Sequence, residues 1–240
     1  MTARFEDQAM IITGAGSGLG QAVAQRLASD GANLVLVDLN SEGLESTKKL
    51  IQEDTADAKV ELVTADVTKE DDVKKYVETT VSSFGKIDGF FNNAGIEGKQ
   101  NLTEDFGLEE FSKVIAVNLN GVFLGMQYVL KQMHEQGHGS IVNTASVGGI
   151  RGVGNQSGYA ASKHGVVGLT RNSAREYGAK GVRINAIAPG AIMTAMVENS
   201  LKQLDPENPE EAGKQFVSAN PMKRFGKPEE VAGLVSFLMA

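Results

Sequence analysis

Short apolar runs alternate with longer amphipathic stretches along the chain, and this alternation limits the folds open to it. The runs are rich in Val and Ile and cover residues 9–12, 34–37, 60–63, 87–91, 140–143 and 183–187. Such runs are typical of strands buried on both faces of a parallel sheet. Their alternation with helices predicts an α/β fold, a doubly wound parallel sheet with helices on both faces.

The amphipathic stretches predict the helices. Leu19, Val23 and Leu27 repeat at helical spacing, and Gly31 is placed to end that helix. Longer helical patterns cover residues 71–84, 108–133 and 156–177. Because neither a linker nor an internal repeat interrupts the chain, we expect one domain over residues 1–240.

Residues 191–220 depart from this pattern. The segment contains Pro206 and Pro209, is followed directly by Pro221, and carries a run of acidic residues. One interpretation is a solvated loop with a short helix. Because the segment follows a strand end directly, and long inserts in compact domains are often lids, we favour a mobile lid over a binding site.

The first apolar run leads into residues 13–20, TGAGSGLG, and then into a helix. Glycines let a backbone approach a pyrophosphate closely, and a helix N-terminus offers free N–H groups. The spacing differs from Gly-x-Gly-x-x-Gly but fits Thr-Gly-x-x-x-Gly-x-Gly. A nucleotide is therefore expected at Gly14, Ser17, Gly18, Leu19 and Gly20.

Asp38 stands at the end of the second run, about 20 residues beyond this loop, where an acid accepts hydrogen bonds from the adenosine ribose. Its charge would repel a 2′-phosphate, and Leu39 beside it is not a cation. We therefore predict NAD(H) rather than NADP(H) as cofactor. The alternative is that Asp38 caps the following turn.

Tyr159 and Lys163 lie four residues apart in a predicted helix, so both side chains share one face. An adjacent ammonium favours the phenolate and lowers the pKa of a tyrosine from its ordinary value near ~10. The pair therefore predicts a proton donor. A packed tyrosine beside a solvated lysine is the alternative for an isolated match.

Composition argues against several classes of site. The net charge of -7 disfavours a nucleic-acid backbone as partner, and 0 cysteines exclude disulfides and thiolate chemistry. His134 and His138 have a spacing that could hold a metal, but glycines flank His138 and no third ligand is in sight. We expect no metal.

The N-terminal segment is polar, and no uninterrupted apolar run reaches the roughly 18 residues that a membrane span needs. We therefore expect a cytoplasmic protein without a membrane partner.

Several motifs, separated along the chain, together resemble those of the short-chain dehydrogenase/reductase family. They are residues 13–20, Asp66-Val67, Asn92-Asn93-Ala94-Gly95, Asn118, Ser146, Tyr159 with Lys163, and Pro189-Gly190. The resemblance implies a single Rossmann-like domain with strand order 3-2-1-4-5-6. It also implies an NAD-dependent oxidoreductase acting on a ketone or secondary alcohol. Ala145 stands where many relatives carry a second serine, which leaves Ser146 itself in place.

The same resemblance implies further contacts with the cofactor. Those expected are Leu39 beside Asp38, Asp66 and Val67 at the adenine, Asn93, Ala94 and Gly95 at the central strand, and Pro189, Gly190, Ile192 and Thr194 at the nicotinamide and pyrophosphate.

The resemblance also assigns catalytic roles. Tyr159 would be the general acid in reduction and the base in oxidation, with its pKa lowered towards neutrality by Lys163 and the oxidised nicotinamide. Ser146 would donate a hydrogen bond to the substrate oxygen. Asn118 would hold a water that links Lys163 to solvent. A strand-end cap for Ser146 and a helix-interior hydrogen bond for Asn118 are the alternatives.

The expected substrate pocket is lined by small or apolar residues, which suits a small cyclic ketone. The candidates are Glu97, Ser146, Gly148, Gly149, Ile150, Asn155, Tyr159, Ile192 and Met196. Glu97 could bind a second polar group of the substrate, or it could be a solvated loop carboxylate.

Other functions remain open. One is a sugar or polyol dehydrogenase, and another is a 3-oxoacyl-carrier reductase, which Asp38 opposes because such reductases usually take NADPH. A non-catalytic NAD-binding regulator is a third, although it would have little need for Ser146, Tyr159 and Lys163 together.

The resemblance further implies a homotetramer paired through the helices at 108–133 and 156–177. The chain stops inside an apolar helix at residues 231–239, whereas the family normally continues into a seventh strand. We therefore expect a seventh strand outside this chain, without which one sheet edge would be unprotected.

Overall fold

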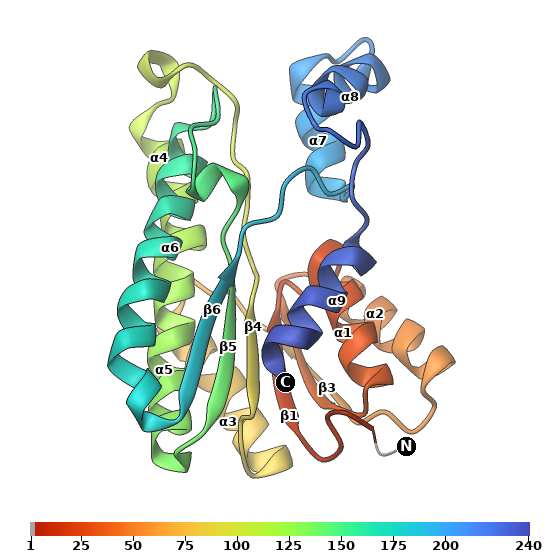
Figure 1. The fold of residues 1–240 in the computed structure, drawn as a ribbon, viewed down its shortest axis with the longest axis vertical. Coiled ribbons are helices and arrows are strands. Elements are labelled where there is room, and N and C mark those ends of the chain that lie inside the picture. Colours follow the sequence, from red (N-terminus) through yellow and green to blue (C-terminus); the bar gives the residue numbers. More distant parts are fainter. Residues whose placement is uncertain (1–2) are drawn as a thin grey trace.

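The computed structural model describes residues 3–240, so residues 1–2 of the expected domain and of the polar N-terminal segment lie outside the described residues. Across the described chain, six parallel strands form one sheet in the order β3-β2-β1-β4-β5-β6 (Figure 1). They are β1 (Ala9–Thr13), β2 (Asn33–Asp38), β3 (Val60–Thr64), β4 (Gly89–Asn92), β5 (Gly139–Thr144) and β6 (Val182–Ile187). The predicted parallel sheet and its strand order are confirmed.

β1 lies at the centre of the sheet, and all five of its residues are buried. Its Met10 is in register with Leu34 of β2 on one side and with Gly89 of β4 on the other. The chain winds outward in opposite directions from this pair of strands. A crevice therefore forms at the carboxyl ends of β1 and β4, where such sheets bind their ligands.

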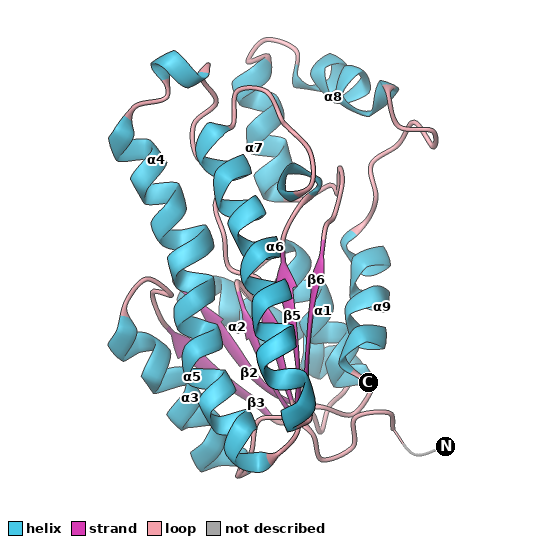
Figure 2. Ribbon diagram, turned by 60° about the vertical axis from the view of Figure 1, so that its left-hand side comes forward, coloured by secondary structure: helices cyan, strands magenta, loops and turns pink. Residues whose placement is uncertain are grey.

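Helices cover both faces of the sheet, as Figures 1 and 2 show. One face carries α1 (Gly18–Ser29), α2 (Ser41–Asp54) and α9 (Pro228–Met239), and the other carries α3 (Glu70–Phe84), α5 (Gly121–Gln136) and α6 (Ser157–Tyr177). Each layer has its own apolar core. Leu27 and Val235 belong to the first core, and Met126 and Val166 to the second.

The helix predicted at residues 108–133 is longer than expected and irregular. It consists of α4 (Leu108–Ile115), a π-helical turn (Ala116–Asn120) and α5. By length and composition, the helix Leu108–Gln136 is long and apolar enough to cross a membrane. It was not predicted as a membrane span because its apolar residues do not form one uninterrupted run. Its α5 part packs onto the sheet through Val122, Met126 and Val129, whereas α4 packs onto α6.

Residues 191–220 form two helices, α7 (Ala195–Leu204) and α8 (Pro209–Ser218), so a loop with one short helix is a wrong description. The Thr194 hydroxyl caps α7, and the Asn208 side chain caps α8. Both helices project beyond the carboxyl ends of the strands (Figure 1). Within residues 3–240, three short 3-10 turns lie at Thr103–Asp105, Val147–Gly149 and Gly178–Lys180.

Candidate active site

The loop after β1 brings free N–H groups to the crevice. Within the described residues, Ser17 precedes α1 without a side-chain hydrogen bond to it, so the first turn keeps its donors. Gly18 has a φ of 54°, which a side chain would strain. A Cβ on Gly20 would overlap the Gly14 carbonyl oxygen. The loop therefore forms a glycine-dependent cradle that fits a pyrophosphate.

Asp38 ends β2 beside this cradle. Its Oδ2 accepts a hydrogen bond from Gly16 N at 2.9 Å, and its Oδ1 accepts one from Asn40 N at 2.9 Å. The turn-capping alternative for Asp38 is thus realised. Each oxygen keeps a second acceptor position, so the carboxylate can cap the turn and still accept from a ribose hydroxyl.

Asn93 ties together three strand ends under the cavity. Its backbone N donates to Thr13 Oγ1 at 2.9 Å, and its side-chain Nδ2 donates to Thr13 O at 3.1 Å. Its Oδ1 accepts from Thr144 Oγ1 at 3.1 Å. These bonds link β1, β4 and β5 at the point where the sheet reverses its winding.

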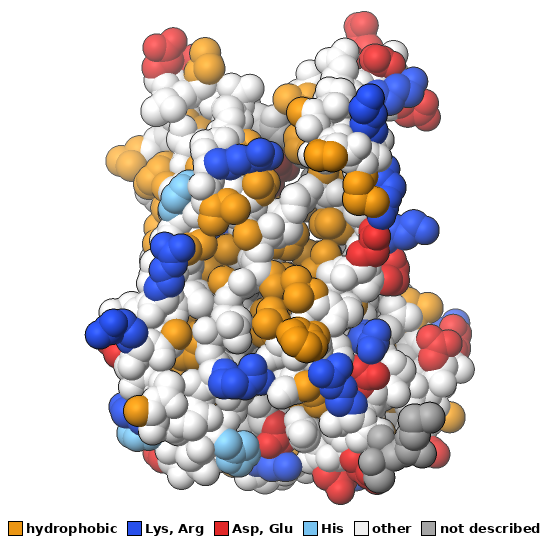
Figure 3. Space-filling view, viewed as in Figure 1, with side chains coloured by type: hydrophobic (Ala, Val, Ile, Leu, Met, Phe, Trp, Pro, Cys, Tyr) orange, Lys and Arg blue, Asp and Glu red, His pale blue; other side chains and the backbone are white. Residues whose placement is uncertain are grey.

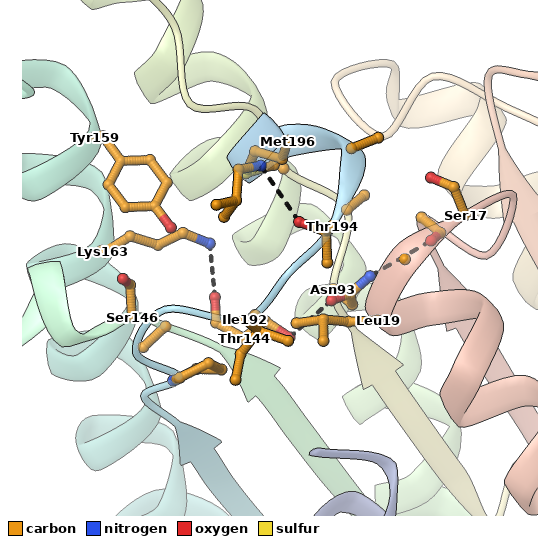
Figure 4. Close-up of a pocket in the computed structure, with 18 of the residues that line it drawn as sticks. Ser17, Leu19, Asn93, Thr144, Ser146, Tyr159, Lys163, Ile192, Thr194 and Met196 are labelled. Atoms are coloured by element: carbon orange, nitrogen blue, oxygen red, sulfur yellow. Dashed lines mark hydrogen bonds between the residues drawn. The ribbon is translucent and has the colours of Figure 1, made fainter. Parts of the chain in front are cut away.

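Tyr159 and Lys163 point from α6 into the same space (Figure 4). Lys163 is 3% exposed, and its Nζ lies 5.6 Å from the Tyr159 ring centroid. The ammonium donates to Thr144 O at 2.7 Å. Burial lowers the pKa of Lys163 to about 8.

The pKa of Tyr159 departs from the prediction. Burial raises it, the neighbouring Ser146 hydroxyl lowers it, and the charge of Glu97 raises it further. The predicted lowering by Lys163 is therefore wrong for the protein alone, because desolvation of the phenolate outweighs an ammonium that is turned towards Thr144. A raised pKa keeps the phenol protonated, as a proton donor requires.

Ser146 makes the local hydrogen bond named as its alternative, whereas Asn118 bonds to a loop 22 positions away rather than within its own helix. Ser146 Oγ accepts from Gly148 N at 3.1 Å. Asn118 lies in the π turn, accepts from Ile96 N at 2.8 Å and donates to Ile96 O at 2.8 Å. A Cβ on Gly95 would lie 3.1 Å from Asn118 Oδ1 and 3.5 Å from Lys163 Nζ, so Asn118 and Lys163 flank one glycine.

One cavity of about 310 Å³ joins these groups. Figure 3 shows this end of the molecule hollowed between two projecting parts. The predicted residues that line the cavity are Gly14, Ser17, Gly18, Leu19, Asp38, Asn93, Ala94, Gly95, Ser146, Tyr159, Lys163, Pro189, Gly190, Ile192, Thr194 and Met196.

Other predicted residues lie outside the lining, among the residues described: Gly20, Leu39, Asp66, Val67, Glu97, Asn118, Gly148, Gly149, Ile150 and Asn155. Gly20 supports the loop from behind. Asp66 Oδ1 accepts from Thr68 N at 2.9 Å in the turn before α3. Ile150 is 61% exposed.

Sequence reasoning missed four lining residues, namely Thr144, Ala145, Ala195 and Val197. Thr144 and Ala145 immediately precede Ser146 at the end of β5, so their place beside a predicted site residue was a usable signal. Ala195 and Val197 enter with α7, whose start the sequence did not mark.

The two spaced histidines point to different neighbours. The His134 ring meets Tyr177 edge-on at a centroid distance of 6.1 Å, whereas His138 Nε2 lies 3.0 Å from Asp88 Oδ1. Among residues 3–240, no group of three or more His, Asp or Glu side chains is placed to hold a metal ion.

Comparison with known proteins shows the family of this chain. A family model described as "Enoyl-(Acyl carrier protein) reductase", within the short-chain dehydrogenases, matches residues 14–240. The chain belongs to the short-chain dehydrogenase/reductase family, and it is an oxidoreductase of that family.

Among individual proteins, levodione reductase from Leifsonia aquatica is 63% identical over 239 residues, which are 100% of this chain and 90% of that protein. A crystal structure of levodione reductase matches with a TM-score of 0.98, over 99% of this chain and 92% of that one. Cyclohexanol dehydrogenase from Acinetobacter sp. (strain SE19) is 42% identical over 241 residues, 100% of this chain and 90% of the relative.

A crystal structure of NAD+-bound xylitol dehydrogenase is 34% identical, with a TM-score of 0.92 over 99% of this chain and 94% of that one. Solved structures similar to this chain include complexes with NAD+, NADH and NADPH. The family therefore points to a nicotinamide cofactor but does not decide whether the 2′ position of its adenosine ribose carries a phosphate.

Proposed function

We propose that the protein is an NAD(H)-dependent oxidoreductase that transfers a hydride between the nicotinamide and a small cyclic ketone or its alcohol. The observation that carries the proposal is the shared cavity, where the glycine cradle and Asp38 meet Ser146, Tyr159 and Lys163. Two similar proteins are named for levodione and for cyclohexanol, which supports a cyclic substrate.

The residues divide the work of the reaction. A bound nicotinamide would supply or accept the hydride. Tyr159 gives a proton to the carbonyl oxygen in reduction and takes it back in oxidation, while Ser146 donates a hydrogen bond to the same oxygen. Lys163 holds positive charge next to the phenol below a pH of about 8. Asn118 holds the loop after β4 through its hydrogen bonds to Ile96. It also lies beside Lys163, where we propose that protons enter the site from solvent.

NAD(H) is the proposed cofactor because Asp38 lines the cavity with a carboxylate, which would repel a 2′-phosphate. The test is Asp38→Ser combined with Leu39→Arg, which keeps an oxygen acceptor near Gly16 and adds a cation. We expect the ratio of kcat/KM for NADPH to that for NADH to rise at least about tenfold. An unchanged ratio would show that Asp38 does not determine the choice between NAD(H) and NADP(H).

We also propose that α7 and α8 act as a lid, and that Asp66, Val67 and Leu39 contact the adenosine part. Glu97, Gly148, Ile150 and Met196 would shape the substrate end.

For the whole protein we propose a cytoplasmic homotetramer without nucleic-acid or membrane partners. The exposed Phe123 on α5 fits a subunit contact, and analytical ultracentrifugation measures the oligomeric state.

The central experiment follows NADH consumption with a panel of cyclic diketones, simple cyclohexanones, sugars and acyl thioesters. We expect the cyclic ketones to give the highest kcat/KM. Tyr159→Phe should lower kcat by roughly 10²-fold or more, with NADH binding retained. Turnover confined to sugars or acyl thioesters would overturn the substrate assignment, and near-normal turnover by Tyr159→Phe would overturn the mechanism.

A further inference from the structure

A carboxylate next to the cavity collects hydrogen bonds from three segments. Glu97, in the loop after β4, accepts on its Oε1 from Ser200 Oγ at 2.9 Å, from Gln100 Nε2 at 3.4 Å and from Gln156 Nε2. Gln100 Nε2 also donates to Ser200 Oγ at 2.6 Å. These four side chains form a closed polar cluster, called here the Glu97 cluster.

Two of the three segments are already fastened to each other. Asn101 N donates to Asn155 O at 3.0 Å, and Asn101 and Gln156 form a parallel bridge. The loop after β4 and the segment before α6 therefore make one wall. Ser200 comes from α7, so its hydroxyl joins a separate helix to this wall at Glu97, while Gln203 Oε1 of the same helix accepts from Gln100 N at 3.3 Å.

The other end of α7 meets the nucleotide cradle. Thr194 caps the helix, and a Cβ on Gly18 would lie 3.4 Å from Thr194 Cγ2. Met196 and Val197, in the first turn of α7, line the cavity. A single helix of 10 residues thus lies beside the cradle at its N-cap and reaches Glu97 through Ser200 in its second turn.

We infer that Ser200 is a positioning residue that couples the two ends of the site: its hydroxyl ties the Glu97 carboxylate at the substrate end to α7, the helix whose N-cap lies beside the cradle. The choice of NADH and ketone as the two ligands rests on the proposed function, but the coupling itself needs only the helix and its two contacts. Ser200 is 4% exposed and lies outside the lining of the cavity among the described residues, so it acts through Glu97 rather than on a ligand.

The charge of Glu97 gives this coupling a chemical consequence. It already acts on Tyr159, whose pKa it raises. Movement of α7 therefore reaches the proton donor by way of one carboxylate. A purely structural Ser200 would instead affect overall stability and leave the link between the two ends of the site unchanged.

The first test needs no ligand. Hydrogen–deuterium exchange is measured in cofactor-free Ser200→Ala, with Asn199→Ala on the exposed side of the same helix as matched control and Ser200→Thr as the variant that keeps the hydroxyl. Loss of a hydrogen bond to a carboxylate should speed exchange of residues 195–204 by about tenfold while the central strands keep their protection. Wild-type exchange of α7 in Ser200→Ala would overturn the inference.

The second test measures the coupling between the ends. NADH release is followed by stopped-flow fluorescence, and we expect it to be several-fold faster in Ser200→Ala than in Asn199→Ala, with rescue by Ser200→Thr. With the best ketone of the panel, KM should rise more than kcat falls. Faster exchange of α7 with unchanged NADH release and KM would refute the coupling. Failure of every ketone in the panel would overturn the proposed function while the exchange result still decides the role of Ser200.

Discussion

Lys163 makes the stability of this protein depend on pH in a direction that can be calculated. Its pKa is about 8 in the folded chain and 10.5 in the ordinary reference state. Between these values the unfolded chain binds more protons than the folded one, so stability rises with pH. Below pH 8 both states carry the charge, and the cost of burying it is at its full value.

The size of the effect follows from this difference in pKa. Each pKa unit corresponds to about 1.4 kcal/mol, so the full cost is roughly 3 kcal/mol, of which about 2–3 kcal/mol should be recovered between pH 7 and pH 10. Lys163→Met has no charge to bury and loses this contribution. Its free energy of unfolding, relative to that of the wild type, should therefore fall by that amount over the same range.

Urea unfolding at several pH values measures this difference directly. Lys49→Met is the matched control, because the Lys49 side chain is 79% exposed and its removal should leave the slope of the stability curve unchanged. The hydrogen bond from Lys163 to Thr144 O affects the offset between the two proteins rather than the slope. Parallel stability curves for Lys163→Met and wild type would show that the folded protein does not bury a charged Lys163.

Other changes test the cradle, the wall and a surface pair. Gly20→Ala should abolish measurable NADH binding in a fluorescence titration, since its Cβ would overlap the Gly14 carbonyl oxygen; binding within about twofold of wild type would contradict the close approach. Asn118→Ala should lower kcat by about tenfold or more and lower the Tm, because both Ile96 backbone groups lose their partner, whereas a change in Tm alone would deny it a part in turnover. The Arg224 pair and the Lys227 N–H hold the pKa of Glu230 at about 2, so its stabilising contribution, present above pH 4.5, should be lost as pH falls towards 2, and Glu230→Gln should flatten that part of the acid unfolding curve.

The strands and the cradle could be predicted because their sequence signals are local. The uninterrupted apolar run at residues 9–12 forms most of the fully buried β1, and the need for glycine at positions 14 and 20 comes from backbone geometry within a few residues. Tyr159 and Lys163 share a face through helix periodicity alone. In each case the residues that determine the structure are near neighbours in the chain.

The missed features depend on residues far apart in the sequence. Ser200 and Glu97 are 103 positions apart, and nothing in either local pattern indicates that they meet. The pKa of Tyr159 was predicted in the wrong direction because the neighbouring lysine is visible in the sequence, while burial of the phenol is a property of the folded chain. The π turn at Ala116–Asn120 was not predicted, because its residue types do not differ from those of an ordinary α-helix.

That turn has a consequence for how the chain can change in length. A π turn holds one residue more than a regular helical turn, so the helix through Leu108–Gln136 contains the equivalent of a one-residue insertion. Deleting one residue there would restore a regular helix. The helical segments on either side would keep their faces, because the wider turn absorbs the extra residue locally, but the turn itself would be reshaped, which would carry Asn118 away from Ile96. Function in this helix is therefore more sensitive to a single deletion than to most substitutions, even though the deletion would leave a better helix.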